Sequence, residues 1–228
     1  MTKRPPIDAI VFDCDGILTD THGLWDQAYA ALFARHGAQL APADRRRLAT
    51  LRTTALGPAL AELLGHSELP GVLADEILSL VARNLGRPVS PMPGAVQLVT
   101  ALASRRPLAV ASNSASQIVR SHLGQIGLAG MFETIVGIDD VAAPKPAPDP
   151  YRLACARLGR TPQVCTAIED SQEGIKSATA AGLYVIGIQA PGDSLDADAV
   201  YPSLTDPALW QALAITDTAA CAARKSPA

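Results

Sequence analysis

Short apolar segments alternate with helix-like segments along most of the 228-residue chain. Five of the short segments are rich in β-branched or small apolar residues, which is typical of buried strands. They cover 7–13, 108–112, 134–138, 164–168 and 184–188. Helical patterns lie between them, over 94–103, 117–123, 151–158 and 174–181. Strand and helix in alternation predict an α/β fold, a Rossmann-like parallel sheet core covered on both faces by helices.

Residues 21–87 interrupt this alternation. Their apolar side chains repeat at helical spacing in three segments, near 24–32, 56–64 and 72–85. We therefore predict an inserted all-helical cap domain over 21–87, with a catalytic core formed by 1–20 and 88–228. Two connections to the core allow a hinge, which is consistent with a lid.

Composition excludes several classes of protein. Hydrophobic residues make up 48% of the chain, charged residues 18%, and the net charge is -3. A nucleic-acid surface needs a concentrated basic face, whereas the dense basic run here, 45–47, is flanked by Asp44 and Leu48 as on the solvated side of a helix. No stretch approaches the roughly 20 apolar residues of a membrane helix. We expect neither a nucleic-acid nor a membrane partner.

The cysteines and the start of the chain indicate a cytoplasmic protein. No apolar signal core precedes Asp8. Cys14, Cys155, Cys165 and Cys221 form no Cys-x-x-Cys pair. Scattered reduced thiols are therefore favoured over a disulfide framework or a zinc site.

Polar residues gather directly after the predicted strands. Asp13 ends the first strand and Asp15 follows it, and Ser112 ends the second. Glu169 and Asp170 follow the fourth. Each alone is typical of a polar turn or a helix cap. Because the carboxyl ends of parallel strands meet at one edge of a sheet, together they favour an active site there.

Four short stretches resemble, in order, the motifs of the haloacid dehalogenase superfamily. They read FDCDGILTD at 12–20, ASN at 111–113, KPAPD at 145–149 and IEDS at 168–171. The stretch PMPG at 91–94 is similar to the segment that follows a helical cap in these proteins. The resemblance extends from about residue 7 to residue 189, and four matches in order are far more specific than any one.

This resemblance implies a phosphatase that acts on a small phosphorylated metabolite, such as a sugar phosphate. Asp13 would attack phosphorus and form an aspartyl-phosphate. Asp15 would protonate the leaving oxygen and then activate water. Ser112 and Lys145 would hold the phosphoryl group.

The resemblance also implies Mg²⁺, which lowers the repulsion between a carboxylate and a phosphate ester. Its expected ligands are Asp13, Asp170 and the main-chain carbonyl of Asp15, with Glu169 binding directly or through water. Gly16 and Asn113 are expected to add main-chain N–H groups around the phosphate, and Arg52 of the cap to meet a substrate anion.

Departures from the family pattern favour some of the family's activities over others. β-Phosphoglucomutases carry a cap His where this chain has Trp25, a cap Arg near Leu56, and a Lys shortly after the position of Ser112. Dehalogenases usually lack the second Asp, present here as Asp15, and phosphonatases use a cap lysine, whereas 21–87 contains none. A phosphatase is therefore favoured; a phosphosugar mutase and a non-catalytic binding protein on the same fold are the alternatives.

Overall fold

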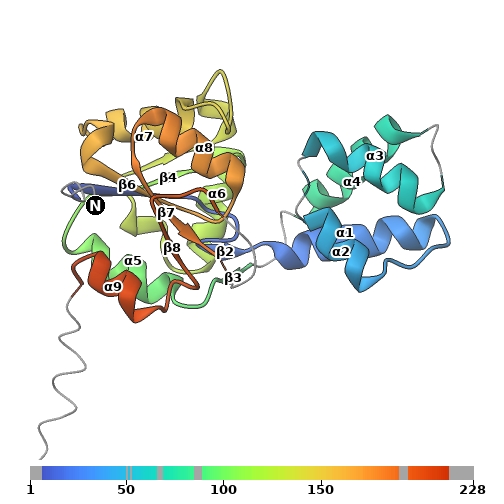
Figure 1. The fold of residues 1–228 in the computed structure, drawn as a ribbon, viewed down its shortest axis with the longest axis horizontal. Helices are drawn as coiled ribbons and strands as arrows, with labels where there is room; N and C mark the ends of the chain where they lie inside the picture. The colour runs from blue at the N-terminus through green and yellow to red at the C-terminus, as the bar shows by residue number, and fades with distance from the viewer. Residues whose placement is uncertain are drawn as a thin grey trace, which may run out of the picture. The chain divides into compact units, whose positions relative to one another are not determined.

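The computed structural model describes residues 7–49, 51, 53–65, 69–84, 89–189 and 195–215 (Figure 1). Contacts divide the chain into two compact units, one of Met1–Asp20 with Val89–Ala228 and one of Thr21–Pro88. The first unit is an α/β core and the second is all-helical in its described part. The predicted fold class is confirmed.

A six-stranded parallel sheet forms the centre of the first unit, in the order β5-β4-β1-β6-β7-β8. The strands are β1 (Ala9–Phe12), β4 (Leu108–Ala111), β5 (Thr134–Val136), β6 (Cys165–Glu169), β7 (Tyr184–Ile188) and β8 (Ala199–Tyr201). Strand β1 lies between β4 and β6, and Phe12 is in register with both Val110 and Ile168. The ends of these three strands therefore lie side by side, where the polar motifs follow them.

Helices cover both faces of the sheet because strand side chains alternate between the faces. On β1, Ile10 and Phe12 belong to the apolar cluster that includes α5 (Ala95–Ala103), α6 (Ser116–Gln125) and α9 (Pro207–Ala212). Ala9 and Val11 belong to the opposite cluster, with α7 (Asp149–Arg157) and α8 (Gln172–Ala181) (Figure 1). A nearly continuous apolar strand thus fills two cores at once.

The helical unit has a core of its own. It contains α1 (His22–Arg35), α2 (Pro42–Ala49), α3 (Thr53–Leu64) and α4 (Pro70–Asn84). Leu32, Leu60, Leu73 and Ile77 are fully buried in it, and each such burial is worth about 1.5–3 kcal/mol. The basic run 45–47 lies on α2, as predicted for a helix surface.

A two-residue ribbon joins the points where the helical segment leaves and re-enters the core. Strand β2 (Thr19–Asp20) pairs antiparallel with β3 (Ser90–Pro91), and the Met92 N–H donates to the Leu18 carbonyl at 3.0 Å. Neither strand of this ribbon was predicted from the sequence, because two residues are too few for a periodic pattern, and β8 was not predicted either. In the described part of the chain, no helix has the length and apolarity to cross a bilayer.

Candidate active site

The predicted nucleophile is held by the main chain of the sheet. Asp13 follows β1 directly, and its N–H donates to the Ile168 carbonyl on β6 at 2.9 Å. The chain then turns sharply: the Cys14 carbonyl accepts from the N–H groups of Leu18 at 2.8 Å and Thr19 at 3.0 Å. A rigid strand end thus presents the carboxylate of Asp13, a residue that is only 8% exposed.

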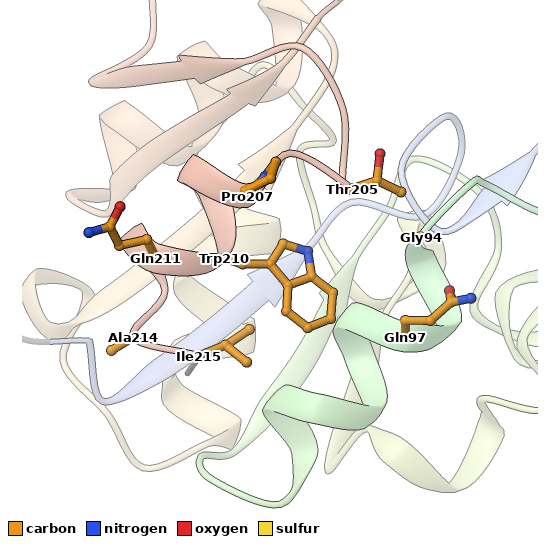
Figure 2. Close-up of a pocket in the computed structure, with 8 residues that line it drawn as sticks. All are labelled: Gly94, Gln97, Thr205, Pro207, Trp210, Gln211, Ala214 and Ile215. Atoms are coloured by element: carbon orange, nitrogen blue, oxygen red, sulfur yellow. The ribbon is translucent and has the colours of Figure 1, made fainter. Parts of the chain in front are cut away.

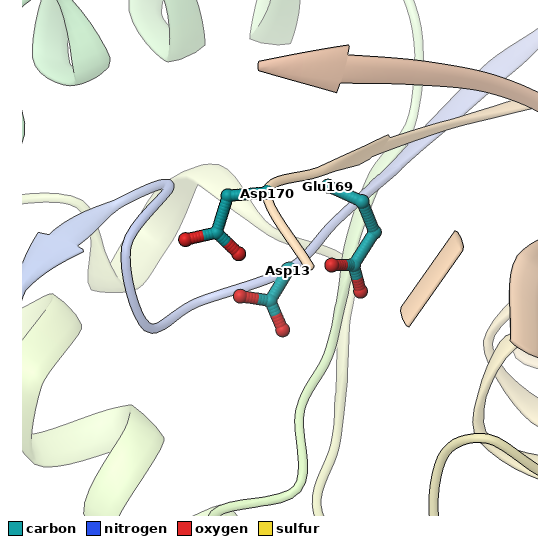
Figure 3. Close-up of side chains that lie close together, drawn as sticks. All are labelled: Asp13, Glu169 and Asp170. Atoms are coloured by element: carbon teal, nitrogen blue, oxygen red, sulfur yellow. The ribbon is translucent and has the colours of Figure 1, made fainter. Parts of the chain in front are cut away.

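Three carboxylates and one ammonium meet at the ends of β1 and β6. Carboxylate oxygens of Asp13, Glu169 and Asp170 lie within 4.8 Å of one another (Figure 3). The Lys145 Nζ donates to Asp13 Oδ1 at 2.6 Å and to Glu169 Oε1 at 2.5 Å. Lys145 is itself buried. The structure therefore brings together the residues that the first, third and fourth motifs supplied.

Tyr151 completes this cluster and was not among the site residues predicted from the sequence. It is fully buried on α7, its hydroxyl donates to Glu169 Oε1 at 2.6 Å, and Lys145 Nζ lies 4.9 Å from the centre of its ring. A cation over an aromatic face is stabilised by the ring quadrupole. The available signal was its place six residues after Lys145, at the start of a helix.

Glu169 has hydrogen-bond donors on both oxygens. Oε1 accepts from Lys145 and Tyr151, and Oε2 accepts from the Ser171 hydroxyl at 3.1 Å and its N–H at 3.4 Å. The side chain is completely buried. Its geometry suits an anchor for Lys145.

Burial and crowding shift the acid–base equilibria of this cluster. Burial raises the pKa of Asp13 well above its usual 3.8; Lys145 opposes the rise, and Glu169 and Asp170 add to it. Burial, reinforced by Glu169, raises the pKa of Asp170 to about 7. Burial works against the Lys145 ammonium, but Asp13 and Glu169 raise its pKa above the usual range. Negative charge beyond what the Lys145 ammonium neutralises is costly in this buried cluster unless a further cation is bound.

The donor set fits a hard divalent cation. Carboxylate oxygens are the ligands that Mg²⁺ prefers, and the chain is shaped around two of them. Gly16 has a φ of +90°, and a methyl group there would overlap Asp170 Oδ2. A methyl group at Gly174 would overlap the Glu169 carboxylate. Both glycines therefore let main chain approach a carboxylate more closely than any other residue would.

Asp15 lies beside the end of β4. Its Oδ2 accepts from the Ser114 hydroxyl at 2.8 Å and has the Ser112 hydroxyl at 3.4 Å. The Ser112 hydroxyl in turn accepts from the Ser114 N–H at 3.0 Å. The second motif and the second aspartate therefore meet.

Two of the predicted phosphate-binding residues are engaged within the protein. The Asn113 side chain binds the main chain of Lys145 twice, donating to its carbonyl at 3.2 Å and accepting from its N–H at 2.9 Å. The Gly16 N–H donates to the Thr19 carbonyl at 2.8 Å. Asn113 thus positions the lysine loop. Arg52 lies outside the described residues.

Trp25 and Leu56, which lie at or near the cap positions predicted to distinguish mutases, are packing residues. The ring of Trp25 lies 5.8 Å from that of Tyr29, centre to centre. Leu56 is 2% exposed in the core of the helical unit. Neither side chain offers a charge or a proton donor equivalent to the Arg or His of a mutase.

A cavity of about 810 Å³ lies elsewhere in the first unit, between α5 and α9 (Figure 2). Gln97, Trp210 and Ile215 are among the residues that line it, and none of the described lining residues is charged. A phosphate ester is commonly held by charged side chains, and the described lining offers none. The carboxylate cluster remains the candidate site.

Comparison with known proteins identifies the family of this chain. Residues 7–182 match the family model of the haloacid dehalogenase-like hydrolases. The fructose-1-phosphate phosphatase YqaB of Escherichia coli is 32% identical over 180 residues, covering 79% of this chain and 95% of the relative. Validoxylamine A 7'-phosphate phosphatase of Streptomyces hygroscopicus subsp. limoneus is 30% identical, covering 86% and 93%.

A solved structure gives the same result for the fold. A haloacid dehalogenase-like protein of unknown function from Agrobacterium tumefaciens superposes with a TM-score of 0.74 at 27% identity, covering 91% of this chain and 99% of that one. The predicted enzyme class, a phosphoric monoester hydrolase, is confirmed by the family match and the phosphatases among the relatives. The chain belongs to the haloacid dehalogenase-like hydrolases.

Proposed function

We propose that this enzyme is a Mg²⁺-dependent phosphatase that hydrolyses a small phosphorylated metabolite through an aspartyl-phosphate on Asp13. One observation carries the proposal. Asp13 lies at the end of the central strand within reach of Lys145, beside Asp170, while Asp15 is bonded to the serines that follow the neighbouring strand. This arrangement supports the roles of nucleophile, metal ligand and proton donor that we assign to these residues.

The reaction takes two steps. In the first, an oxygen of Asp13 bonds to phosphorus, the bond from phosphorus to the leaving oxygen breaks, and the proton of Asp15 passes to that oxygen. In the second, water bonds to phosphorus and gives a proton to Asp15 while the bond between phosphorus and Asp13 breaks. Inorganic phosphate leaves and the Asp13 carboxylate is restored. Asp15 is protonated again at the end, so the cycle closes.

The other residues hold charge and orientation. Lys145 faces Asp13 and is placed to offset charge on the transferring group, with Glu169 and Tyr151 fixing its ammonium. Ser112 offers a hydroxyl at the same edge. Mg²⁺, when bound, supplies the positive charge that lets an anionic carboxylate approach an anionic phosphate. Asp13, Asp170 and the Asp15 carbonyl would hold it.

A sugar phosphate or a similar polyol phosphate is the proposed substrate class. Relatives named as phosphatases of fructose 1-phosphate and of validoxylamine A 7'-phosphate support it. The helical unit 21–88 is the proposed source of specificity, since the chemistry lies in the other unit. A soluble cytoplasmic enzyme is in keeping with the three described cysteines, which are free and buried.

The test combines a metal and a substitution. Wild-type protein should release phosphate from p-nitrophenyl phosphate or acetyl phosphate in Mg²⁺, lose this activity in EDTA, and regain it with Mg²⁺. Asp13→Asn should reduce activity by at least about 10³-fold, because an amide neither attacks phosphorus nor holds Mg²⁺ well. Asp8→Asn, an exposed aspartate just before β1, is the matched control. Full activity of the wild type in EDTA would contradict the role of Mg²⁺. Full activity of folded Asp13→Asn would contradict the role of Asp13 as nucleophile.

A panel of phosphorylated metabolites, assayed by phosphate release in excess Mg²⁺, then identifies the substrate. The proposal expects sugar and polyol phosphates to have the highest kcat/KM. A panel in which only nucleotides or phosphopeptides react would contradict the substrate class while leaving the chemistry in place.

A further inference from the structure

Ser114 is the residue with the shortest hydrogen bond to the proposed proton donor. Its hydroxyl donates to Asp15 Oδ2 at 2.8 Å, whereas the Ser112 hydroxyl lies at 3.4 Å from the same oxygen. The other oxygen, Oδ1, has no hydrogen-bond partner in the described part of the chain. Ser114 therefore fixes one side of the carboxyl group and leaves the other side available.

The main chain of Ser114 is fixed from both directions. Its N–H donates to the Ser112 hydroxyl at 3.0 Å, and its carbonyl accepts from the Ile138 N–H at 3.1 Å, just after β5. Asp15 in turn lies in the turn closed by the bonds to the Cys14 carbonyl. A hydroxyl on so constrained a backbone loses little entropy when it orients a neighbour.

We infer that Ser114 is a positioning residue that holds the Asp15 carboxyl group in the orientation for proton transfer to the leaving oxygen. The inference rests on the proposed function. Ser114 makes no bond in the reaction: the proton travels from Asp15 to the leaving oxygen as the phosphorus–oxygen bond breaks. Its hydroxyl donates to the oxygen that does not carry this proton.

A residue that positions the acid affects catalysis differently from a residue that binds phosphate. Protonation of the leaving oxygen matters when that oxygen is a poor leaving group and matters little when it is a good one. Phenyl phosphate and p-nitrophenyl phosphate have nearly the same shape, but the nitrophenolate departs far more readily. The ratio of their kcat/KM values therefore reports on the acid, while effects on binding or folding cancel. The value of kcat/KM depends only on the steps up to and including departure of the leaving group. Hydrolysis of the aspartyl-phosphate therefore does not affect it.

The experiment measures both substrates with wild type, Ser114→Ala, Ser114→Thr and Ser116→Ala in saturating Mg²⁺. Ser114→Ala should lose about tenfold in kcat/KM on phenyl phosphate and less than about twofold on p-nitrophenyl phosphate, a part of the 10²–10⁴ that general acid catalysis contributes. Ser114→Thr keeps a hydroxyl and should restore the wild-type ratio. Ser116, whose hydroxyl donates to Asp139 at 2.8 Å, is the matched control and should not change it.

Equal losses of Ser114→Ala on both substrates would overturn the inference, because phosphate binding or general stability would explain them. An unchanged ratio without any loss would overturn it as well. If wild type hydrolyses neither substrate, nor any metabolite of the panel, the proposed function fails and the inference with it. If wild type is active and only the ratio fails to move, the proposed function stands and the role of Ser114 is refuted.

Discussion

Asp170 should make the metal-free protein less stable as the pH rises, and Mg²⁺ should cancel this loss. Burial and Glu169 raise the pKa of Asp170 from 3.8 to about 7 in the folded protein. A carboxyl group whose pKa is raised by folding favours the folded state while protonated. Its contribution is fully present below the unfolded pKa and is lost as the pH rises through about 7.

The size of the effect follows from that shift. One pH unit of difference in pKa corresponds to about 1.4 kcal/mol, and most of the loss falls between pH 5 and pH 8. Asp170 is partly exposed to solvent, so the full value is an upper bound, and we expect about 2–3 kcal/mol over this interval. For a domain of this size, that is about 5–10 °C in melting temperature.

Asp170→Asn isolates this contribution because asparagine mimics the protonated carboxyl group. Melting temperatures of wild type and Asp170→Asn are compared in EDTA at pH 5 and pH 8, so that other titrating groups cancel. The substitution should stabilise the protein at pH 8 much more than at pH 5, and excess Mg²⁺ should stabilise wild type alone. An Asp170→Asn protein no more stable than wild type in EDTA at pH 8 would refute the reasoning.

Three other outcomes are expected. Tyr151→Phe removes a buried hydroxyl that donates to the Glu169 carboxylate, so urea denaturation should show a loss of about 2 kcal/mol in unfolding free energy; an unchanged midpoint would contradict this. Gly16→Ala places a methyl group on Asp170 Oδ2 at a positive φ, so the Mg²⁺ titration of the melting temperature should shift to at least about tenfold higher concentration. β-Glucose 1-phosphate should yield free phosphate slowly or not at all, and little glucose 6-phosphate in a coupled dehydrogenase assay; efficient glucose 6-phosphate formation would establish a mutase.

Most of the fold could be predicted because its signals are local. The strands β1, β4, β6 and β7 are largely apolar runs that are mostly buried on both faces, and each ends at or just before a polar residue. Strand β8 was missed since its alternation is weak, with Val200 exposed. Helix α9 was also missed, because its six residues offer less than two turns of helical pattern.

The site was predictable as far as its residues carry distinctive chemistry in motif order. Asp13, Lys145 and Asp170 do, and they lie together in the structure. Tyr151 and Ser114 carry no such mark: a buried tyrosine is usually core, and a serine after a strand is usually a turn residue. Their importance arises from partners more than ten residues away, Glu169 and Asp15, which only the three-dimensional arrangement brings near.

The ribbon of β2 and β3 has a consequence for how such an enzyme can change. The two points where the chain leaves and re-enters the core are paired with each other, Thr19 with Pro91 and Asp20 with Ser90. This pairing involves none of residues 21–88. The entropy of closing a longer or shorter loop between them grows only logarithmically with its length. Other segments with closely spaced ends can therefore replace residues 21–88 at this ribbon, in evolution or by grafting. The catalytic core should still fold. A chimaera that carries a relative's helical segment between Asp20 and Ser90 should keep the chemistry of Asp13 while changing which phosphate esters it accepts.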